Sequence, residues 1–218
     1  MSVAIENFVK AVYKNDKDES HDTKPGTIAK KLGISNAAAT DMAKKLAEKD
    51  LVDYKKYQKL QLTEKGNKMA LNILRKHRLW EALLFKLFDM SLHDIHREAE
   101  LLEHQTSEFL VEQISSYLGH PKFDPHGDPI PNSKGKITTK DTSIPLSSAS
   151  QGHEYIISRL MSDDKEFFEF CAQNGLKYGN KIQVKKQFNN NMTEILIDNN
   201  TIILNHDISK IIYVNENN

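Results

Sequence analysis

The sequence has little cysteine and no long apolar run, and each shortage excludes a class of protein. Cys171 is the only cysteine among 218 residues, which excludes an intramolecular disulfide framework and any cysteine-rich zinc module. No apolar run is long enough to cross a bilayer, and the first residues carry charges where a signal peptide needs an apolar stretch. The hydrophobic fraction of 39% is too high for a disordered chain. We therefore expect a folded cytoplasmic protein with no membrane partner.

A net charge of zero hides an asymmetry along the chain. Residues 1–80 hold 17 Lys and Arg against 10 Asp and Glu, whereas the remaining residues hold 13 against 20. A basic amino-terminal part suits a polyanionic partner such as nucleic acid when a matching motif accompanies the charge.

The amino-terminal third has the pattern of a winged helix-turn-helix. An apolar stripe with helical spacing runs from Ile5 to Tyr13, and a short segment from Thr27 to Leu32 ends at Gly33. Ser35 is placed to cap a second helix over residues 36–49. Alternating apolar residues then lead into and out of the basic tip KKYQK, which predicts a β-wing.

This arrangement predicts a DNA-binding surface, because a helix fits the major groove while nearby lysines neutralise phosphates. The expected phosphate contacts are Lys44, Lys45, Lys55, Lys56 and Lys59. The residues expected at base edges are Ser35, Ala37, Ala38, Thr40 and Asp41, and Thr27 and Asn36 are also expected to contact DNA. The alternative is that the lysines form an ordinary solvated face.

The middle of the chain carries a possible metal constellation. In a helix predicted to begin at Thr63, His77 and Glu81 occupy two positions on a face that is otherwise apolar. A second helix, predicted over residues 92–118, places four more such groups on one face: His96, Glu100, Glu103 and His104. A divalent cation would satisfy all six groups, and imidazole with carboxylate suits manganese, ferrous iron or zinc. The alternative is a set of surface residues on an acidic helix.

Five segments together resemble a known family. IAKKLGIS, LTEKG, RKHRLWE, IHREAELLEH and DPHGDPIP, in this order, are similar to the diphtheria-toxin-repressor family of iron- and manganese-dependent transcriptional regulators. The resemblance covers about residues 5–131 most clearly. It implies a winged-helix domain, a helical dimerisation domain with two metal sites and, as in many members, a small SH3-like β-domain.

The resemblance also implies roles for the ligand candidates. His77, Glu81 and His96 resemble ligands of an ancillary site, whereas Glu100, Glu103 and His104 resemble those of a primary site. The iron-responsive branch usually has Cys at the position of Glu100, and the manganese-responsive branch has Glu. The resemblance is therefore greater to the manganese-responsive branch, since a carboxylate is a harder ligand than a thiolate.

The first helix departs from the family pattern. In the motif ENFVKAVY, Asn7 stands where Met or Asp is usual, and Lys10 stands where manganese regulators often have Glu. We expect Asn7 to serve as a further metal ligand through its amide oxygen, directly or through water. The number of ions and the metal preference stay open.

The remainder predicts a linker and a β-rich domain. Five of the six prolines fall between Pro121 and Pro145, and a tract rich in Ser, Thr, Lys and Gly follows the first four of them. A short helix over residues 164–174 precedes strand patterns at residues 182–184, 192–197, 201–204 and 208–214.

Several residues near this region receive an expected role. The resemblance implies that Asp164 lends an oxygen to the ancillary site; Phe167 stands where Gln is usual, with Glu166 as a substitute. Cys171 is expected to be an inert core thiol. His120 and His126 are interpreted as structural turn residues.

The fold expected is mainly α with β, in four parts. These are a winged helix-turn-helix domain (1–72), a helical metal-binding and dimerisation domain (73–131), a flexible linker (132–152) and an SH3-like small β-barrel (153–218). The function expected is a homodimeric repressor of metal-uptake genes that binds double-stranded operator DNA with Mn²⁺ or Fe²⁺; zinc and other divalent transition ions suit the same ligands.

Two rival functions stay open. One is a winged-helix transcription factor without metal dependence. The other is a di-iron carboxylate oxidase, but such enzymes need paired Glu-x-x-His motifs that these helices lack. The sequence also has no nucleophile triad or phosphate-cradling glycine loop, so we expect no enzyme.

Overall fold

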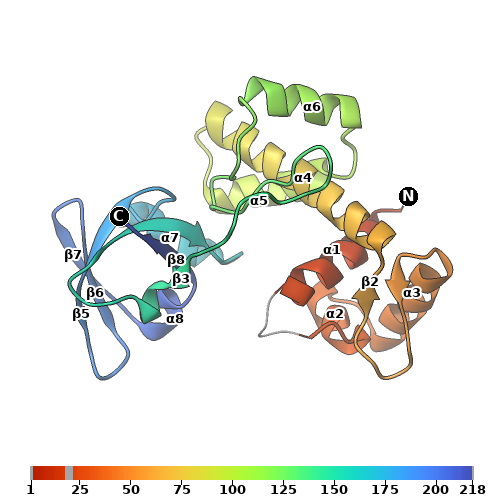
Figure 1. The fold of residues 1–218 in the computed structure, drawn as a ribbon, viewed down its shortest axis with the longest axis horizontal. Helices are drawn as coiled ribbons and strands as arrows, with labels where there is room; N and C mark the ends of the chain where they lie inside the picture. Colours follow the sequence, from red (N-terminus) through yellow and green to blue (C-terminus); the bar gives the residue numbers. More distant parts are fainter. Residues whose placement is uncertain (1, 18–21, 218) are drawn as a thin grey trace. The chain divides into compact units, whose positions relative to one another are not determined.

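The computed structural model describes residues 2–17 and 22–217 (Figure 1). The chain divides into two compact units. Unit 1 contains Met1–His77, Leu101–Glu112 and Pro131–Ile137, and unit 2 contains Arg78–Glu100, Gln113–Ile130 and Thr138–Asn218. Within the described ranges, no helix combines the length and the apolar character needed to cross a membrane.

Three helices open the chain: α1 (Val3–Lys17), α2 (Pro25–Leu32) and α3 (Asn36–Glu48). Gly33 ends α2 in the left-handed region with φ 65°, which glycine adopts without strain. Ser35 caps α3 by accepting a hydrogen bond of 3.1 Å from the backbone N–H of Ala38. The expected helix, glycine turn and helix are confirmed, while residues 18–21 of the intervening polar loop lie outside the described residues.

The three helices share one apolar core. It contains Phe8, Val9 and Val12 of α1, Ile28 of α2, and Ala39, Ala43 and Leu46 of α3, all fully or almost fully buried. The wing is a short antiparallel pair, β1 (Val52–Asp53) with β2 (Gln61–Leu62). A Cβ at Gly66 would lie 2.0 Å from the Leu51 carbonyl oxygen, so the helix after the wing approaches the backbone closely only because this residue is glycine.

The helical region contains α4 (Glu64–Leu87), α5 (Leu92–Leu102) and α6 (Glu108–Tyr117). The prediction of one helix over residues 92–118 is wrong, because the chain leaves the helix after Leu102. The Thr106 hydroxyl donates to the Leu102 carbonyl at 2.6 Å, and the Ser107 hydroxyl accepts from the Leu110 N–H at 3.2 Å. These hydroxyls satisfy backbone groups that the helix ends leave open.

The carboxy-terminal part of the chain is an antiparallel six-stranded sheet in the order β3-β8-β4-β5-β6-β7. The strands are β3 (Ile144–Pro145), β4 (Glu154–Leu160), β5 (Lys181–Gln187), β6 (Thr193–Ile197), β7 (Asn200–Leu204) and β8 (Ile212–Glu216). A 3₁₀ turn (Leu146–Ser148), α7 (Lys165–Gln173) and the single turn α8 (His206–Ser209) accompany the sheet. The expected small β-domain is therefore confirmed.

Two details differ from the sequence expectation. Residues 144–148, which we placed in the linker, form β3 and the 3₁₀ turn, and Ile208 lies in α8 rather than in a strand. Between β6 and β7, Asp198 and Asn199 both have positive φ values, 46° and 65°. Such a pair forms the tight two-residue turn that suits an antiparallel hairpin.

Candidate metal sites and DNA-binding surface

Helix α3 and the wing expose the residues that we expect at DNA. The candidates Ser35, Asn36, Ala37, Ala38, Asp41, Lys44 and Lys45 are exposed, Thr40 is half-buried, and the wing lysines Lys55, Lys56 and Lys59 are exposed. Tyr57 at the wing tip is 84% exposed. Thr27 is half-buried, and its hydroxyl donates to Asp22, which lowers the pKa of that carboxyl. The surface is therefore polar and largely cationic, whereas the opposite face of α3 is core.

Within unit 1, the turn after α5 brings ligand candidates together. Glu103 is buried, with one oxygen 2.8 Å from His77 Nδ1 and the other 3.2 Å from His104 Nε2. His104 Nδ1 also lies 2.6 Å from Glu6 Oε2, on α1. We predicted that Glu103 and His104 share a helix face with His96 and Glu100. This prediction is wrong, because α5 ends before Glu103.

Helix α1 carries two further polar side chains close to Glu6 in the sequence, Asn7 and Lys10. The Asn7 side-chain oxygen is buried and makes no hydrogen bond to any described residue. A buried amide oxygen without a donor is costly, and a cation is one partner that would satisfy it. Lys10 Nζ lies 2.6 Å from Glu103 Oε1. Helix α1 therefore places the cationic side chain of Lys10 against Glu103. From the sequence we expected only that a ligand could be missing at position 10.

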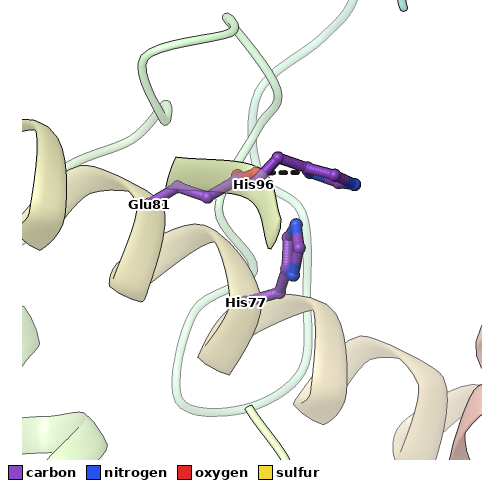
Figure 2. A group of neighbouring side chains, drawn as sticks. All are labelled: His77, Glu81 and His96. Atoms are coloured by element: carbon purple, nitrogen blue, oxygen red, sulfur yellow. Dashed lines mark hydrogen bonds and ion pairs between the residues drawn. The ribbon is translucent and has the colours of Figure 1, made fainter. Parts of the chain in front are cut away.

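Within unit 2, Glu81 is the centre of a second group. Glu81 follows His77 by one turn of α4, and Glu81 Oε1 lies 2.8 Å from His96 Nδ1 (Figure 2). The other ring nitrogen of His96 lies 3.8 Å from Glu100 Oε1, one turn further along α5. His96 therefore stands between two of the predicted carboxylates.

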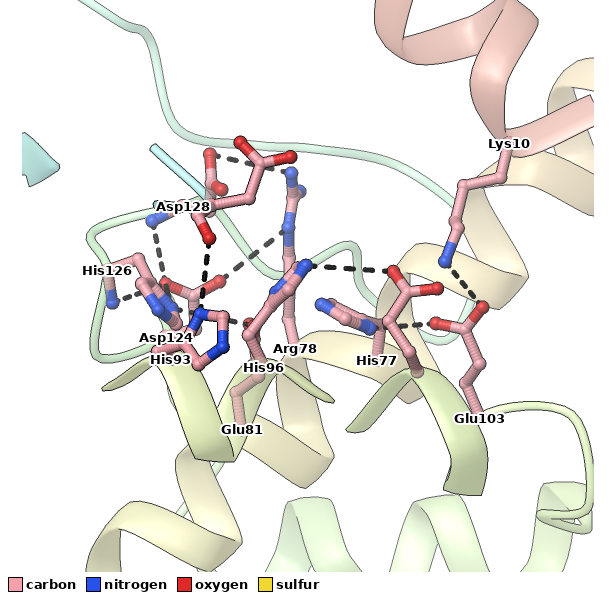
Figure 3. A network of polar contacts seen from close by, with 12 residues as sticks. Lys10, His77, Arg78, Glu81, His93, His96, Glu103, Asp124, His126 and Asp128 are labelled. Carbon is pink, nitrogen blue, oxygen red and sulfur yellow. Dashed lines mark hydrogen bonds and ion pairs between the residues drawn. The ribbon is translucent and has the colours of Figure 1, made fainter. Parts of the chain in front are cut away.

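A loop after α6 adds two residues that the sequence reasoning did not assign to metal. Asp124, His126 and Glu81 are all buried, and each offers a ligand atom within 4.8 Å of the others (Figure 3). His126 lies in a turn, as expected, but its side chain also joins this group: His126 Nδ1 lies 3.5 Å from Glu81 Oε1, and its ring packs on Phe168 of α7. The available signal was the presence of an acidic side chain and a histidine two residues apart in DPHGDP.

The loop is held in place by backbone contacts. Asp124 Oδ1 accepts hydrogen bonds from the N–H groups of His126 and Asp128, both at 2.9 Å. The carbonyl of His126 accepts from Leu160 N–H at 2.8 Å. A Cβ at Gly127, whose φ is 91°, would lie 2.0 Å from the Ser158 carbonyl oxygen. The loop conformation therefore depends on glycine at position 127.

The electrostatics of this group suit a divalent cation. Burial, followed by the neighbouring carboxylates Glu81 and Asp128, raises the pKa of Asp124 well above its ordinary value. Arg78 opposes this, with Nε 3.8 Å from Asp124 Oδ2. His126 Nε2 is buried and has no hydrogen-bond partner among the described residues. Two buried carboxylates beside an imidazole with an orphaned nitrogen form a donor set that fits manganese, ferrous iron or zinc.

Asp164 has a local role in the structure. Its Oδ1 accepts a hydrogen bond of 3.0 Å from the Phe167 N–H and so caps α7. Asp164 is not part of a metal-ligand group among the described residues. Its neighbour Asp163 contributes a backbone carbonyl that lies 3.2 Å from His93 Nδ1.

These features define a class of protein: a winged-helix DNA-binding domain followed by a helical region with carboxylate–imidazole metal groups and a small β-domain. Three domain families match in the same order. Residues 1–60 match "Iron dependent repressor, N-terminal DNA binding domain", residues 63–132 match "Iron dependent repressor, metal binding and dimerisation domain", and residues 144–216 match the FeoA domain.

The chain belongs to the diphtheria-toxin-repressor family of iron- and manganese-dependent transcriptional regulators. An uncharacterized HTH-type transcriptional regulator of Methanocaldococcus jannaschii is 33% identical over 118 residues, which are 54% of this chain and 94% of that protein. The iron-dependent repressor IdeR of Mycobacterium tuberculosis is 33% identical over 104 residues, 48% of this chain and 45% of that protein. A manganese-dependent transcriptional repressor solved with manganese has a TM-score of 0.88 at 27% identity, covering 97% of this chain and 99% of that one.

Proposed function

We propose that this protein is a homodimeric repressor that binds operator DNA when manganese or ferrous iron is bound, controls metal-uptake genes, and has no enzymatic activity. The observation that carries the proposal is the presence in one chain of a cationic α3 and wing surface and of buried carboxylate–imidazole groups. Similar repressors have been solved with manganese, cadmium or zinc, which supports a divalent ion as the signal.

The ligand chemistry favours a hard ion. Glu81, Asp124 and His126 would hold one ion, with His96 oriented by Glu81. The only thiol, that of Cys171, is buried in the core of the β-domain, where burial raises its pKa to about 12. Since no thiolate is available as a soft ligand, oxygen and nitrogen donors favour manganese, which leaves iron and zinc as competitors. The bound ion would neutralise the buried carboxylates.

A second copy of the chain is the partner that the helical region suits. Phe85 and Phe88 near the end of α4 are each 55% exposed, and Tyr117 at the end of α6 is 58% exposed. Lys86 Nζ lies 4.7 Å from the centre of the Tyr117 ring, so the end of α4 lies beside the end of α6. Large exposed apolar side chains on neighbouring helix ends are typical of protein interfaces. All three residues lie within the segment that matches the dimerisation domain.

Metal and DNA binding would be coupled through α1. Glu6 and Asn7 lie on α1, whereas Glu103 and His104 lie in the turn after α5, so an ion that contacts both segments would restrict α1. In a symmetric dimer, two winged-helix domains must match two half-sites about one DNA turn apart. Metal would select conformations that meet this requirement.

The test is a DNA-binding titration across metals. Duplexes selected from a random library with purified protein and Mn²⁺ should bind at least tenfold more tightly with Mn²⁺ than with a chelator. By linkage, the same duplex should tighten Mn²⁺ binding by the same factor. Selective DNA binding that is indifferent to every divalent ion would identify a metal-independent regulator instead. Failure to select any duplex would overturn the proposed function.

A further inference from the structure

A lysine occupies the metal-ligand group of unit 1. Lys10 is 5% exposed, and its ammonium nitrogen lies 2.6 Å from Glu103 Oε1 (Figure 3). The Glu103 side chain is fully buried. A buried lysine is expensive unless a carboxylate pairs with it, so this contact is a specific requirement of the site and not an incidental surface pair.

The carboxylate that Lys10 contacts is the one that joins the other ligand candidates. Glu103 also faces His77 at 2.8 Å and His104 at 3.2 Å, and His104 faces Glu6 at 2.6 Å. The ammonium therefore takes one oxygen of the central carboxylate and supplies positive charge at the place where a cation would otherwise bridge α1 and the turn after α5.

Apart from the Glu6 carboxylate, which faces His104, the first helix offers little to a second ion. Asn7 brings a neutral oxygen, and position 10 brings positive charge in place of a ligand. Two divalent ions close together need several carboxylates to offset their mutual repulsion, and Lys10 both removes a donor and adds to that repulsion.

We propose that the Lys10 ammonium is a built-in cation that replaces one metal ion at this site. It links α1 to the turn after α5 in the absence of metal, and the site accepts one ion fewer than it would with a carboxylate at position 10. This inference rests on the proposed function, because the metal-free link matters only if the orientation of α1 governs DNA binding.

The test compares two variants of the full-length chain with the unmodified protein. Lys10→Glu should bind one more Mn²⁺ per subunit, counted by isothermal titration and by metal analysis after dialysis. Lys10→Met keeps the length but loses the charge, and it should weaken metal-free DNA binding by tenfold or more. Lys17→Met removes an exposed lysine from the same helix; it should leave the number of bound Mn²⁺ ions unchanged and alter metal-free DNA binding by no more than about twofold, the spread of a typical surface substitution.

The outcomes separate the two proposals. An equal number of Mn²⁺ ions in Lys10→Glu and the unmodified protein would overturn the inference. Metal-free DNA binding by Lys10→Met that equals or exceeds that of the unmodified protein would also overturn it, because Lys10 would then only compete with metal. If Lys10→Glu does not fold without metal, the protein is purified with Mn²⁺ present, and Lys10→Met supplies the second readout. The ion count needs no DNA, so it holds even if selective DNA binding fails.

Discussion

His126 Nδ1 lies 3.5 Å from Glu81 Oε1, which joins the loop after α6 to the middle of α4. Asp124 completes the group from the same loop, and its carboxylate is held by two backbone N–H groups. A position that reads as a turn residue in the sequence is thus part of a buried polar group. The predicted ligand set of α4 and α5 is extended by a loop that the sequence did not assign to it.

If Asp124 and His126 are ligands, removing either one should weaken metal binding strongly. His126→Ala and Asp124→Asn should each lower Mn²⁺ affinity by tenfold or more, equivalent to at least about 1.4 kcal/mol. Isothermal titration would measure the change. The exposed His153→Ala is a matched control and should bind Mn²⁺ as the unmodified protein does. Unchanged affinity in His126→Ala would remove His126 from the ligand set.

The wing lysines should contribute phosphate contacts. Replacing Lys55 and Lys56 with Ala should weaken binding to every duplex and reduce the slope of log affinity against log salt by roughly 1.8, if each lysine neutralises one phosphate. Fluorescence anisotropy at several salt concentrations measures this slope. Changing Thr40 or Asp41 should instead alter the preference among sequences. A salt slope that does not change in the double variant would exclude the wing from the phosphate contacts.

Cys171 should be unreactive in the folded protein. Burial raises the pKa of its thiol to about 12, so only about one molecule in ten thousand carries the reactive thiolate at pH 8. Ellman's reagent should label less than a tenth of the protein in an hour at pH 8, and should label one thiol per chain once urea unfolds the β-domain. Rapid labelling of the native protein would show that the core around α7 opens readily.

Asp141 should make stability depend on acid pH. Burial alone would raise the pKa of Asp141, but hydrogen bonds from Ser143 and from Arg159 outweigh it and hold the pKa below its ordinary value. The carboxylate therefore stabilises the fold above the unfolded-state pKa of about 3.9, and this contribution is lost as pH falls through the lower folded-state value.

Urea unfolding at a series of pH values checks this prediction. Asp141→Asn should be less stable than the unmodified protein at pH 6, and the difference should shrink as pH falls below 4. The exposed Asp89→Asn is the control and should follow the unmodified protein. A difference that stays constant with pH would mean that the Asp141 charge contributes nothing.

Local pattern was sufficient for most of the fold. The helical spacing of apolar residues in α1 and α3, the left-handed Gly33 and the Ser35 cap are decided by residues within one or two turns of each other. The single helix expected over residues 92–118 failed for a local reason too, since hydroxyls at Thr106 and Ser107 compete for the backbone hydrogen bonds.

By itself the sequence determined which segments form the winged helix, the helical region and the β-domain, and it identified His77, Glu81, His96, Glu100, Glu103 and His104 as polar groups at helical spacing. Only the tertiary structure decided which of these groups meet and what else joins them. Lys10 reaches Glu103, and Asp124 with His126 reaches Glu81, through contacts between residues far apart in the chain. Such contacts depend on where packing places a whole helix or loop, and no period or spacing within a short window of sequence encodes that distance.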